Sequence, residues 1–180
     1  MQDTWPLVEA FFREKGLVRQ HLDSYNDFID HGIQRVIDEI NGINLDIEGV
    51  YVKFGQVKLG KSSVREADGS RPEITPNEAR LRNFSYTAPI HLEMSLVRRG
   101  KEGQPDTVYI GELPVMLKSD LCNLSEKSED ELVAAGEDPL DPGGYFIING
   151  SERVIVTQED LASNSILVER DERMGTEVAK

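Results

Sequence analysis

The sequence has a single cysteine, Cys122, so neither an internal disulfide nor a multi-cysteine metal site can form. It has no continuous apolar run long enough to predict a membrane-spanning helix. Basic residues are few, with 20 Lys and Arg against 33 Asp and Glu and a formal net charge of −13. Because phosphate binding requires positive charge, this balance disfavours a free-standing, non-specific nucleic-acid coat. A small basic face on an acidic body remains compatible with it.

Several catalytic patterns are also missing. Neither common glycine-rich phosphate loop occurs. The histidines His21, His31 and His91 lack the spacing of a helical zinc pair, and Cys122 has no histidine near it in the sequence. The amino terminus lacks the basic start and apolar stretch of a secretory signal, which predicts a cytoplasmic protein. No self-contained catalytic or metal site is predicted.

The remaining composition, 38% hydrophobic and 29% charged over 180 residues, predicts a globular core of one domain or one domain plus part of another. Two helices are expected first. One begins at Thr4 and ends at Gly16. The second has a helical stripe from Tyr25 to Ile40, with Ser24 as its cap and Asn41-Gly42 as its end. We interpret the stripe as core.

After residue 42 the hydrophobic period changes to two, which predicts strands. Pro89 lies inside the longest one, which therefore should be an edge strand or be broken there. Asn149-Gly150 predicts a type I′ turn in a hairpin. The expected strands are 45–48, 50–54, 57–59, 84–96, 107–110, 113–117, 145–148, 151–156 and 166–169.

Short helices should follow the capping boxes that begin at Thr75 and Ser128. Residues 60–73 and 98–106 are interpreted as polar connections, and the acid-rich run 120–141 as a solvated face. The fold class is α+β, with N-terminal helices followed by a mostly antiparallel mixed sheet.

Four blocks of the sequence, in the same order, resemble the second-largest subunit of multisubunit DNA-directed RNA polymerase in its archaeal form. They are residues 16–28, 76–86, 113–119 and 143–159. The last block, GGYFIINGSERVIVTQE, is the most specific. After it the chain departs from the bacterial pattern.

The resemblance implies that residues 1–162 form the incomplete N-terminal part of the protrusion domain and that 163–180 begin the lobe domain. It implies a structural wall of the DNA cleft in a nucleotidyltransferase. No catalytic residue or cofactor is expected in this segment, and the magnesium of the assembled polymerase would be held elsewhere. The expected partners are the other polymerase subunits, template DNA and RNA, initiation factor B and a NusG-like elongation factor. No membrane contact is expected.

The residues expected to face nucleic acid are Arg153 and Gln158, with Arg80 and Arg82 behind them. For Arg80 and Arg82, pairing with acids inside the fold is the favoured alternative. For Arg153, the alternative is a hairpin that Ser151 and Glu152 brace without touching a ligand. A basic patch is expected to contact DNA or a factor, unless it serves only solubility. It consists of Arg98, Arg99 and Lys101.

A second hypothesis is an independent acidic protein-interaction module that shares only the fold. The two hypotheses differ in what they predict for the surface. A module should be stable alone, whereas a polymerase segment should leave apolar surface uncovered where the rest of the subunit packs.

Overall fold

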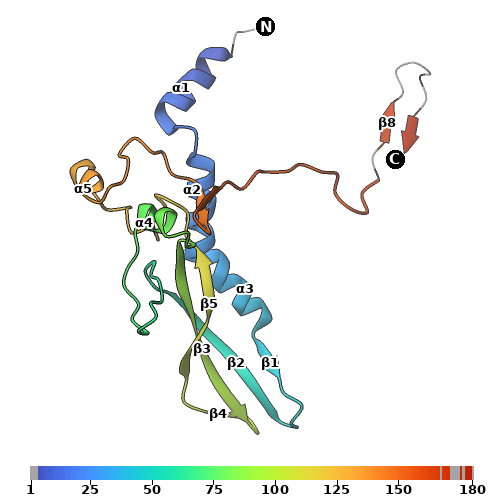
Figure 1. Cartoon of the computed structure of the whole chain (residues 1–180). Coiled ribbons are helices and arrows are strands. Elements are labelled where there is room, and N and C mark those ends of the chain that lie inside the picture. The colour runs from blue at the N-terminus through green and yellow to red at the C-terminus, as the bar shows by residue number, and fades with distance from the viewer. Residues whose placement is uncertain (1–3, 167, 171–174, 176, 180) are drawn as a thin grey trace.

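The computed structural model describes residues 4–166, 168–170, 175 and 177–179. It confirms the α+β class, with helices first and antiparallel strands after them (Figure 1). The helices are α1 (Trp5–Lys15), α2 (Arg19–Asp27), the π-helix η1 (Phe28–Gly32), α3 (Ile33–Ile40), α4 (Pro76–Leu81) and α5 (Glu129–Ala134). The strands are β1 (Gly42–Asn44), β2 (Val50–Leu59), β3 (Thr87–Arg98), β4 (Lys101–Glu102), β5 (Asp106–Pro114), β6 (Phe146–Ile148), β7 (Ser151–Arg153), β8 (Val168–Arg170) and β9 (Glu177–Ala179).

The second predicted helix is longer than expected, because α2, η1 and α3 follow one another without a break. Ser24 is therefore not its cap, and its hydroxyl donates to the carbonyl of His21 at 3.0 Å. The first turn has one apolar residue, Leu22, which packs against the cluster around Tyr25, and it carries an ion pair from Arg19 to Asp23 at 2.7 Å. The predicted end is confirmed, since Asn41 takes the left-handed conformation with φ of 59°.

The main sheet has the order β1-β2-β3-β4, with β5 paired to β3. Strand β3 is thus central and unbroken, and the edge position that Pro89 predicted is wrong. The β2 ladder ends where Leu59 pairs with Ile90, so Pro89 lies just past it and removes no ladder hydrogen bond. Gly60 then donates its N–H to the Pro89 carbonyl at 2.9 Å. A Cβ on Gly60 would lie 2.7 Å from the Pro89 ring, so this close approach requires glycine.

Two pairs of predicted strands are single strands interrupted by bulges. The register of β2 against β3 shifts between Phe54 and Val57, and that of β5 shifts opposite Ile90 and His91. A bulge inserts one residue and reverses the alternation without ending the strand, which explains the errors. The expected strand 113–117 ends at Pro114, and its last residues enter the core. The connection at 98–106 is a tight hairpin into β4.

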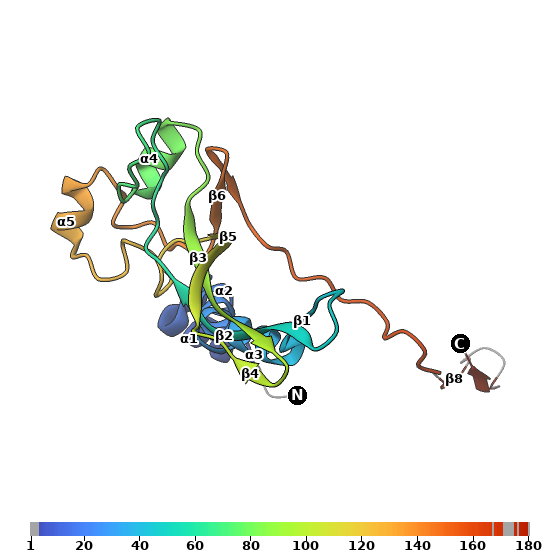
Figure 2. The ribbon, with the colours of Figure 1, turned by 90° about the horizontal axis from the view of Figure 1, so that it is seen from below.

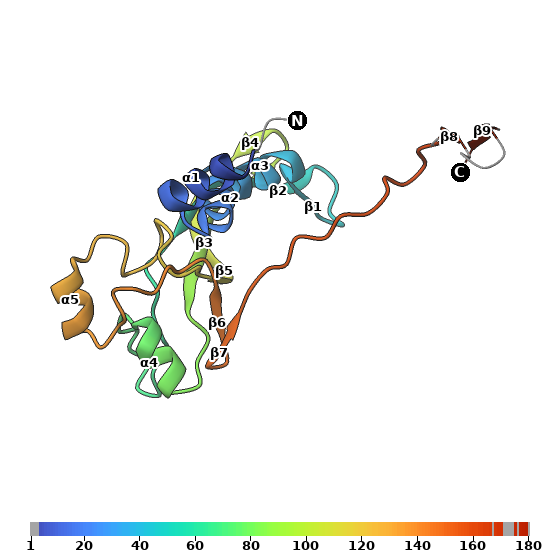
Figure 3. The same cartoon turned by 90° about the horizontal axis from the view of Figure 1, so that it is seen from above.

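The helices α2 and α3 run beside the sheet, apart from α4 and α5, as Figures 2 and 3 show. At the β2 bulge, Gln34 of α3 accepts from Val57 N–H at 2.9 Å and donates to the Gly55 carbonyl at 3.3 Å. The main core lies at the end where β3 begins. Its fully buried side chains include Ile74, Tyr86, Val115, Leu117 and Ile147.

A large apolar surface is uncovered. The chain exposes 13636 Å², against about 8,800 Å² for a compact monomer of this mass. No residue of α1 is buried, and its Trp5, Leu7 and Phe11 are each more than half exposed. The coil after residue 157 runs away from the body (Figure 1). This uncovered surface is what the polymerase hypothesis predicts and what a free-standing module would avoid.

The end of the chain differs from expectation. The predicted strand 166–169 includes residue 167, which lies outside the described residues. Strand β8 pairs with β9, a closing strand that the sequence did not predict. The division between protrusion and lobe at residue 163 stays a prediction. In the described part of the chain, no helix combines the length and hydrophobicity needed to span a bilayer.

Candidate nucleic-acid interface

The hairpin of β6 and β7 carries the most specific sequence block. Asn149 and Gly150 have φ of 51° and 75°, which confirms the predicted type I′ turn. The strands are short, however, and β7 ends at Arg153 instead of reaching Val156. The residues after Arg153 are exposed coil.

The tip of this hairpin is docked against the end of α4. Gly150 N–H donates to the Phe84 carbonyl at 3.0 Å, and Asn149 N–H donates to the Ser85 hydroxyl at 3.0 Å. Below the tip, Tyr86 N–H donates to the carbonyl of the buried Ile147 at 2.9 Å. The hairpin is therefore fixed to segment 83–86 by backbone contacts on its β6 side.

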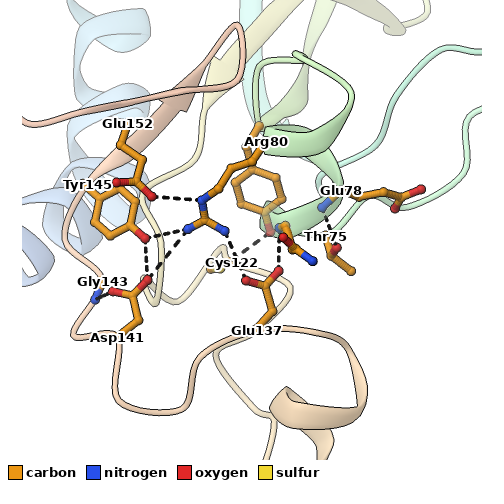
Figure 4. Close-up of polar contacts among 11 residues, drawn as sticks. Thr75, Glu78, Arg80, Cys122, Glu137, Asp141, Gly143, Tyr145 and Glu152 are labelled. Atoms are coloured by element: carbon orange, nitrogen blue, oxygen red, sulfur yellow. Dashed lines mark hydrogen bonds and ion pairs between the residues drawn. The ribbon is translucent and has the colours of Figure 1, made fainter.

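Arg80, at the end of α4, reaches across to the same hairpin (Figure 4). Its Nε donates to Glu152 Oε1 of β7 at 3.0 Å. Its Nη1 donates to Glu137 Oε2 at 3.3 Å, and its Nη2 donates to the Tyr145 hydroxyl at 2.6 Å. Nη2 also lies 3.8 Å from Asp141 Oδ2. One guanidinium thus joins three carboxylates, two from the connection between α5 and β6 and one from β7.

The charges around Arg80 are mutually satisfied. Glu137 is buried and also accepts from Asn77 N–H at 2.6 Å. Burial and the hydrogen bond to Asp141 raise the pKa of Tyr145, so its hydroxyl stays protonated and donates to Asp141. These acids line a cavity of about 580 Å³. The prediction that 120–141 is only a solvated face is therefore wrong for Glu137, because the fold brings Arg80 to it.

Arg82 is also paired inside the fold. Its Nη2 lies 2.8 Å from Glu66 Oε1, its Nη1 lies 3.8 Å from Glu78, and its guanidinium stacks 4.6 Å from the centre of the Phe84 ring. Arg80 and Arg82 thus both pair with acids inside the fold, which is the favoured alternative to a contact with nucleic acid. A contact between either one and nucleic acid stays a prediction.

Arg153 lies on the opposite face of β7 from Glu152, at the rim of a groove of about 470 Å³. It is exposed, and its guanidinium has no hydrogen bond or ion pair to any residue that the structure describes. Residues of α2, the end of β5, the β6–β7 hairpin and the coil after it line the groove. They include Gln20, Tyr25, Phe28, Met116, Phe146, Ile148, Val154 and Ile155.

The floor of this groove is held by an aromatic contact and a hydrogen bond, both made by Tyr25. The Tyr25 ring packs edge-on against Phe146, with ring centres 5.6 Å apart, and its hydroxyl donates to the Pro114 carbonyl at 2.6 Å. Burial raises the pKa of Tyr25. At the rim, Gln20 Nε2 donates to the Thr157 hydroxyl at 3.4 Å. Gln158 follows in the exposed coil.

The predicted basic patch forms the tip of the β3–β4 hairpin. Arg99 and Gly100 have φ of 49° and 75°, and Arg99 N–H donates to the Gly49 carbonyl at 2.8 Å. Arg98, Arg99 and Lys101 are exposed, and none forms an ion pair within the described ranges. The adjacent Glu102 is occupied by Ser95 at 2.7 Å and Lys53 at 2.9 Å.

Two features of the region could not be found from the sequence. The acids that hold Arg80 lie 57, 61 and 72 positions away from it, and no local pattern marks them. The groove joins α2 to β6 and β7, more than a hundred residues later. Among the described residues, no group of three His, Cys, Asp or Glu side chains is arranged to hold a metal ion.

Most of the chain matches a known protein family. A family model described as RNA polymerase beta subunit matches residues 16–169, which is most of the chain. This chain therefore belongs to the RNA polymerase beta subunit family, as the four sequence blocks predicted.

Particular relatives place it in the archaeal branch. It is 54% identical over 169 residues to DNA-directed RNA polymerase subunit Rpo2 of Saccharolobus shibatae, covering 94% of this chain and 15% of that protein. It is 54% identical to subunit Rpo2N of Methanococcus vannielii, covering 93% and 34%. For Rpo2N of Halobacterium salinarum the identity is 48%, covering 98% and 36%. The chain thus spans between about a seventh and about a third of these relatives.

Proposed function

We propose that this chain is the N-terminal segment of a DNA-directed RNA polymerase large subunit, acting in the cytoplasm within the assembled nucleotidyltransferase. The observation that carries the proposal is the 54% identity to archaeal polymerase subunits over 94% of the chain. The uncovered apolar surface of α1 supports it, because such a surface is stable only when another part of the assembly covers it.

The role proposed for this segment is structural, as a wall of the DNA cleft on the upstream side. Its described residues do not fit a metal ion, so no catalytic step is assigned to them. The magnesium of the assembled polymerase would be held by residues outside this segment. A sheet with a docked hairpin suits such a role, because it can present a few cations without being basic overall.

Arg153 and Gln158 are the proposed contacts with nucleic acid in the cleft. Arg153 supports this role because it is exposed and lacks an acidic partner in the described structure, although the chain has 33 acids. A guanidinium left unpaired at the rim of a groove is available for a charge-assisted hydrogen bond to a phosphate.

The tip residues Arg98, Arg99 and Lys101 are proposed as a second contact, with upstream DNA, initiation factor B or a NusG-like elongation factor. Three unpaired cations within four positions are a local positive field on an acidic body. Such a field attracts an anionic surface and weakens with salt.

The assembly is tested by tagging the full-length gene product and purifying it from native cells. Recovery of the other polymerase subunits, with extension of RNA on a DNA template, is expected. A product that elutes alone and extends no RNA would contradict the proposal and favour the interaction-module hypothesis.

A further inference from the structure

We propose that Arg80 is a positioning residue: through Glu152 it fixes strand β7, and thereby sets where Arg153 stands at the rim of the groove. This inference rests on the proposed function, because it assigns a role to Arg80 in how Arg153 meets nucleic acid. It differs from a direct contact by Arg80, whose guanidinium is enclosed by Glu137, Asp141, Tyr145 and Glu152 (Figure 4).

Strand β7 is otherwise weakly held. Strand β6 is anchored by buried Ile147 and by the backbone bond from Tyr86, but all three residues of β7 are exposed. Within the described structure, the Arg80–Glu152 ion pair is the only polar contact between a β7 side chain and an element other than the hairpin. A three-residue strand paired on one side alone is marginal in water, so this contact matters.

Arg80 itself is held from several sides. Its side chain is 24% exposed and is held at three further points, by Glu137, Asp141 and the Tyr145 hydroxyl. A planar guanidinium with several fixed partners loses little further entropy when it binds one more carboxylate. Arg80 can therefore act as a fixed point for Glu152.

Glu152 and Arg153 lie on opposite faces of β7. Successive side chains of a strand point to opposite faces, so the position of Glu152 determines the direction of Arg153. Glu152 faces Arg80, and Arg153 faces the groove beside Tyr25 and Ile155. Loss of the ion pair should therefore let Arg153 sample more positions.

The experiment uses polymerase reconstituted with the full-length subunit and a labelled scaffold of template DNA and complementary RNA, titrated over a series of salt concentrations. Two variants separate positioning from simple charge. Glu152→Gln removes a negative charge, so a pure field effect predicts tighter binding, whereas positioning predicts affinity weaker by about two- to five-fold. Arg80→Lys keeps the positive charge but loses the planar guanidinium that binds several carboxylates at once. The positioning role therefore again predicts weaker binding.

Arg153→Gln defines the contact itself and should lower the salt slope by about 1. Adding Glu152→Gln to Arg153→Gln should change the affinity no further, because Glu152 would act only through Arg153. Glu39→Gln, the same change at an exposed glutamate of α3 outside the Arg80 cluster, is the matched control and should leave affinity unchanged.

The outcomes distinguish the two proposals. If Arg153→Gln leaves affinity and slope unchanged, the proposed contact of Arg153 is wrong, and positioning through it fails as well. If Arg153→Gln weakens binding but Glu152→Gln tightens it or has no effect, the contact stands and the positioning role of Arg80 is wrong. Additive losses in the double variant would also overturn it.

Discussion

Two hairpin tips of this chain have the same backbone geometry and opposite surroundings. Asn149-Gly150 and Arg99-Gly100 are both two-residue turns with positive φ at each position. The first is docked on segment 83–86, whereas the second projects from the end of the sheet. Turn residues therefore determine the shape of a hairpin, while the contacts that the hairpin makes depend on which other segments the fold places beside it.

The charges at the two tips differ in the same way. Beside the docked tip, Glu152 is paired with Arg80, and that arginine is further balanced by Glu137 and Asp141. At the projecting tip, Arg98, Arg99 and Lys101 have no ion pair among described residues. The docked tip therefore serves the fold first, and the projecting tip has its charge available for a partner.

The largest expected effect comes from alanine at the two turn glycines. A Cβ at Gly150 would lie 2.7 Å from Asn83 Oδ1 and 2.9 Å from Asn83 Cα, whereas one at Gly100 would meet nothing within 4 Å. Both variants incur the left-handed backbone penalty, about 1 kcal/mol. Gly150→Ala should add overpacking and cost about 3 kcal/mol in all.

Hydrogen exchange in the assembled subunit measures this difference. The Tyr86 amide reports on the docked hairpin and the Gly103 amide on the projecting one. The loss of protection should be larger by more than about tenfold for Gly150→Ala. Equal losses in the two variants would contradict the prediction, because they would show that the close approach of Gly150 to Asn83 adds no cost to the alanine substitution.

The next effect concerns the free cations of the projecting tip. Replacing Arg98, Arg99 and Lys101 together by Gln should lower the salt slope of duplex DNA binding by as much as about 2–3, at about 0.9 for each phosphate contact. Hydrogen exchange at Gly103 should not change. The matched control makes the same change at three other exposed cations, Arg13, Arg35 and Lys127. An equal loss of slope in the control would mean that only net charge matters.

The smallest expected effect is a pH dependence at the projecting hairpin. Hydrogen bonds from Ser95 and then Lys53 lower the pKa of Glu102 below its ordinary 4.5. The folded state therefore binds the proton more weakly than the unfolded state, so the stabilisation is complete above 4.5 and is lost as the pH falls through the lowered pKa. Exchange at Gly103, corrected for its intrinsic pH dependence, should rise on acidification. In Glu102→Gln this extra rise should be absent, and its persistence would contradict the assignment.

Local patterns predicted much of the secondary structure. The Thr75 hydroxyl accepts from Glu78 N–H at 3.2 Å, and Ser128 N–H donates to Glu131 at 2.8 Å, so both predicted helix starts are confirmed. The turn at Asn149-Gly150 and the helix end at Asn41 are confirmed as well. In each case the determining contacts join residues at most four positions apart, which is why a single sequence shows them.

The family, the α+β class and the chemistry of each turn and cap follow from local sequence patterns. The packing of distant segments is what makes β3 central despite Pro89, buries Glu137, and pairs Arg80 with Glu152 while the Arg153 side chain has no partner in the described chain. These outcomes depend on contacts between residues far apart in the chain. Such contacts are set by which faces the packed sheet and helices bring together, and the local residue pattern does not record them.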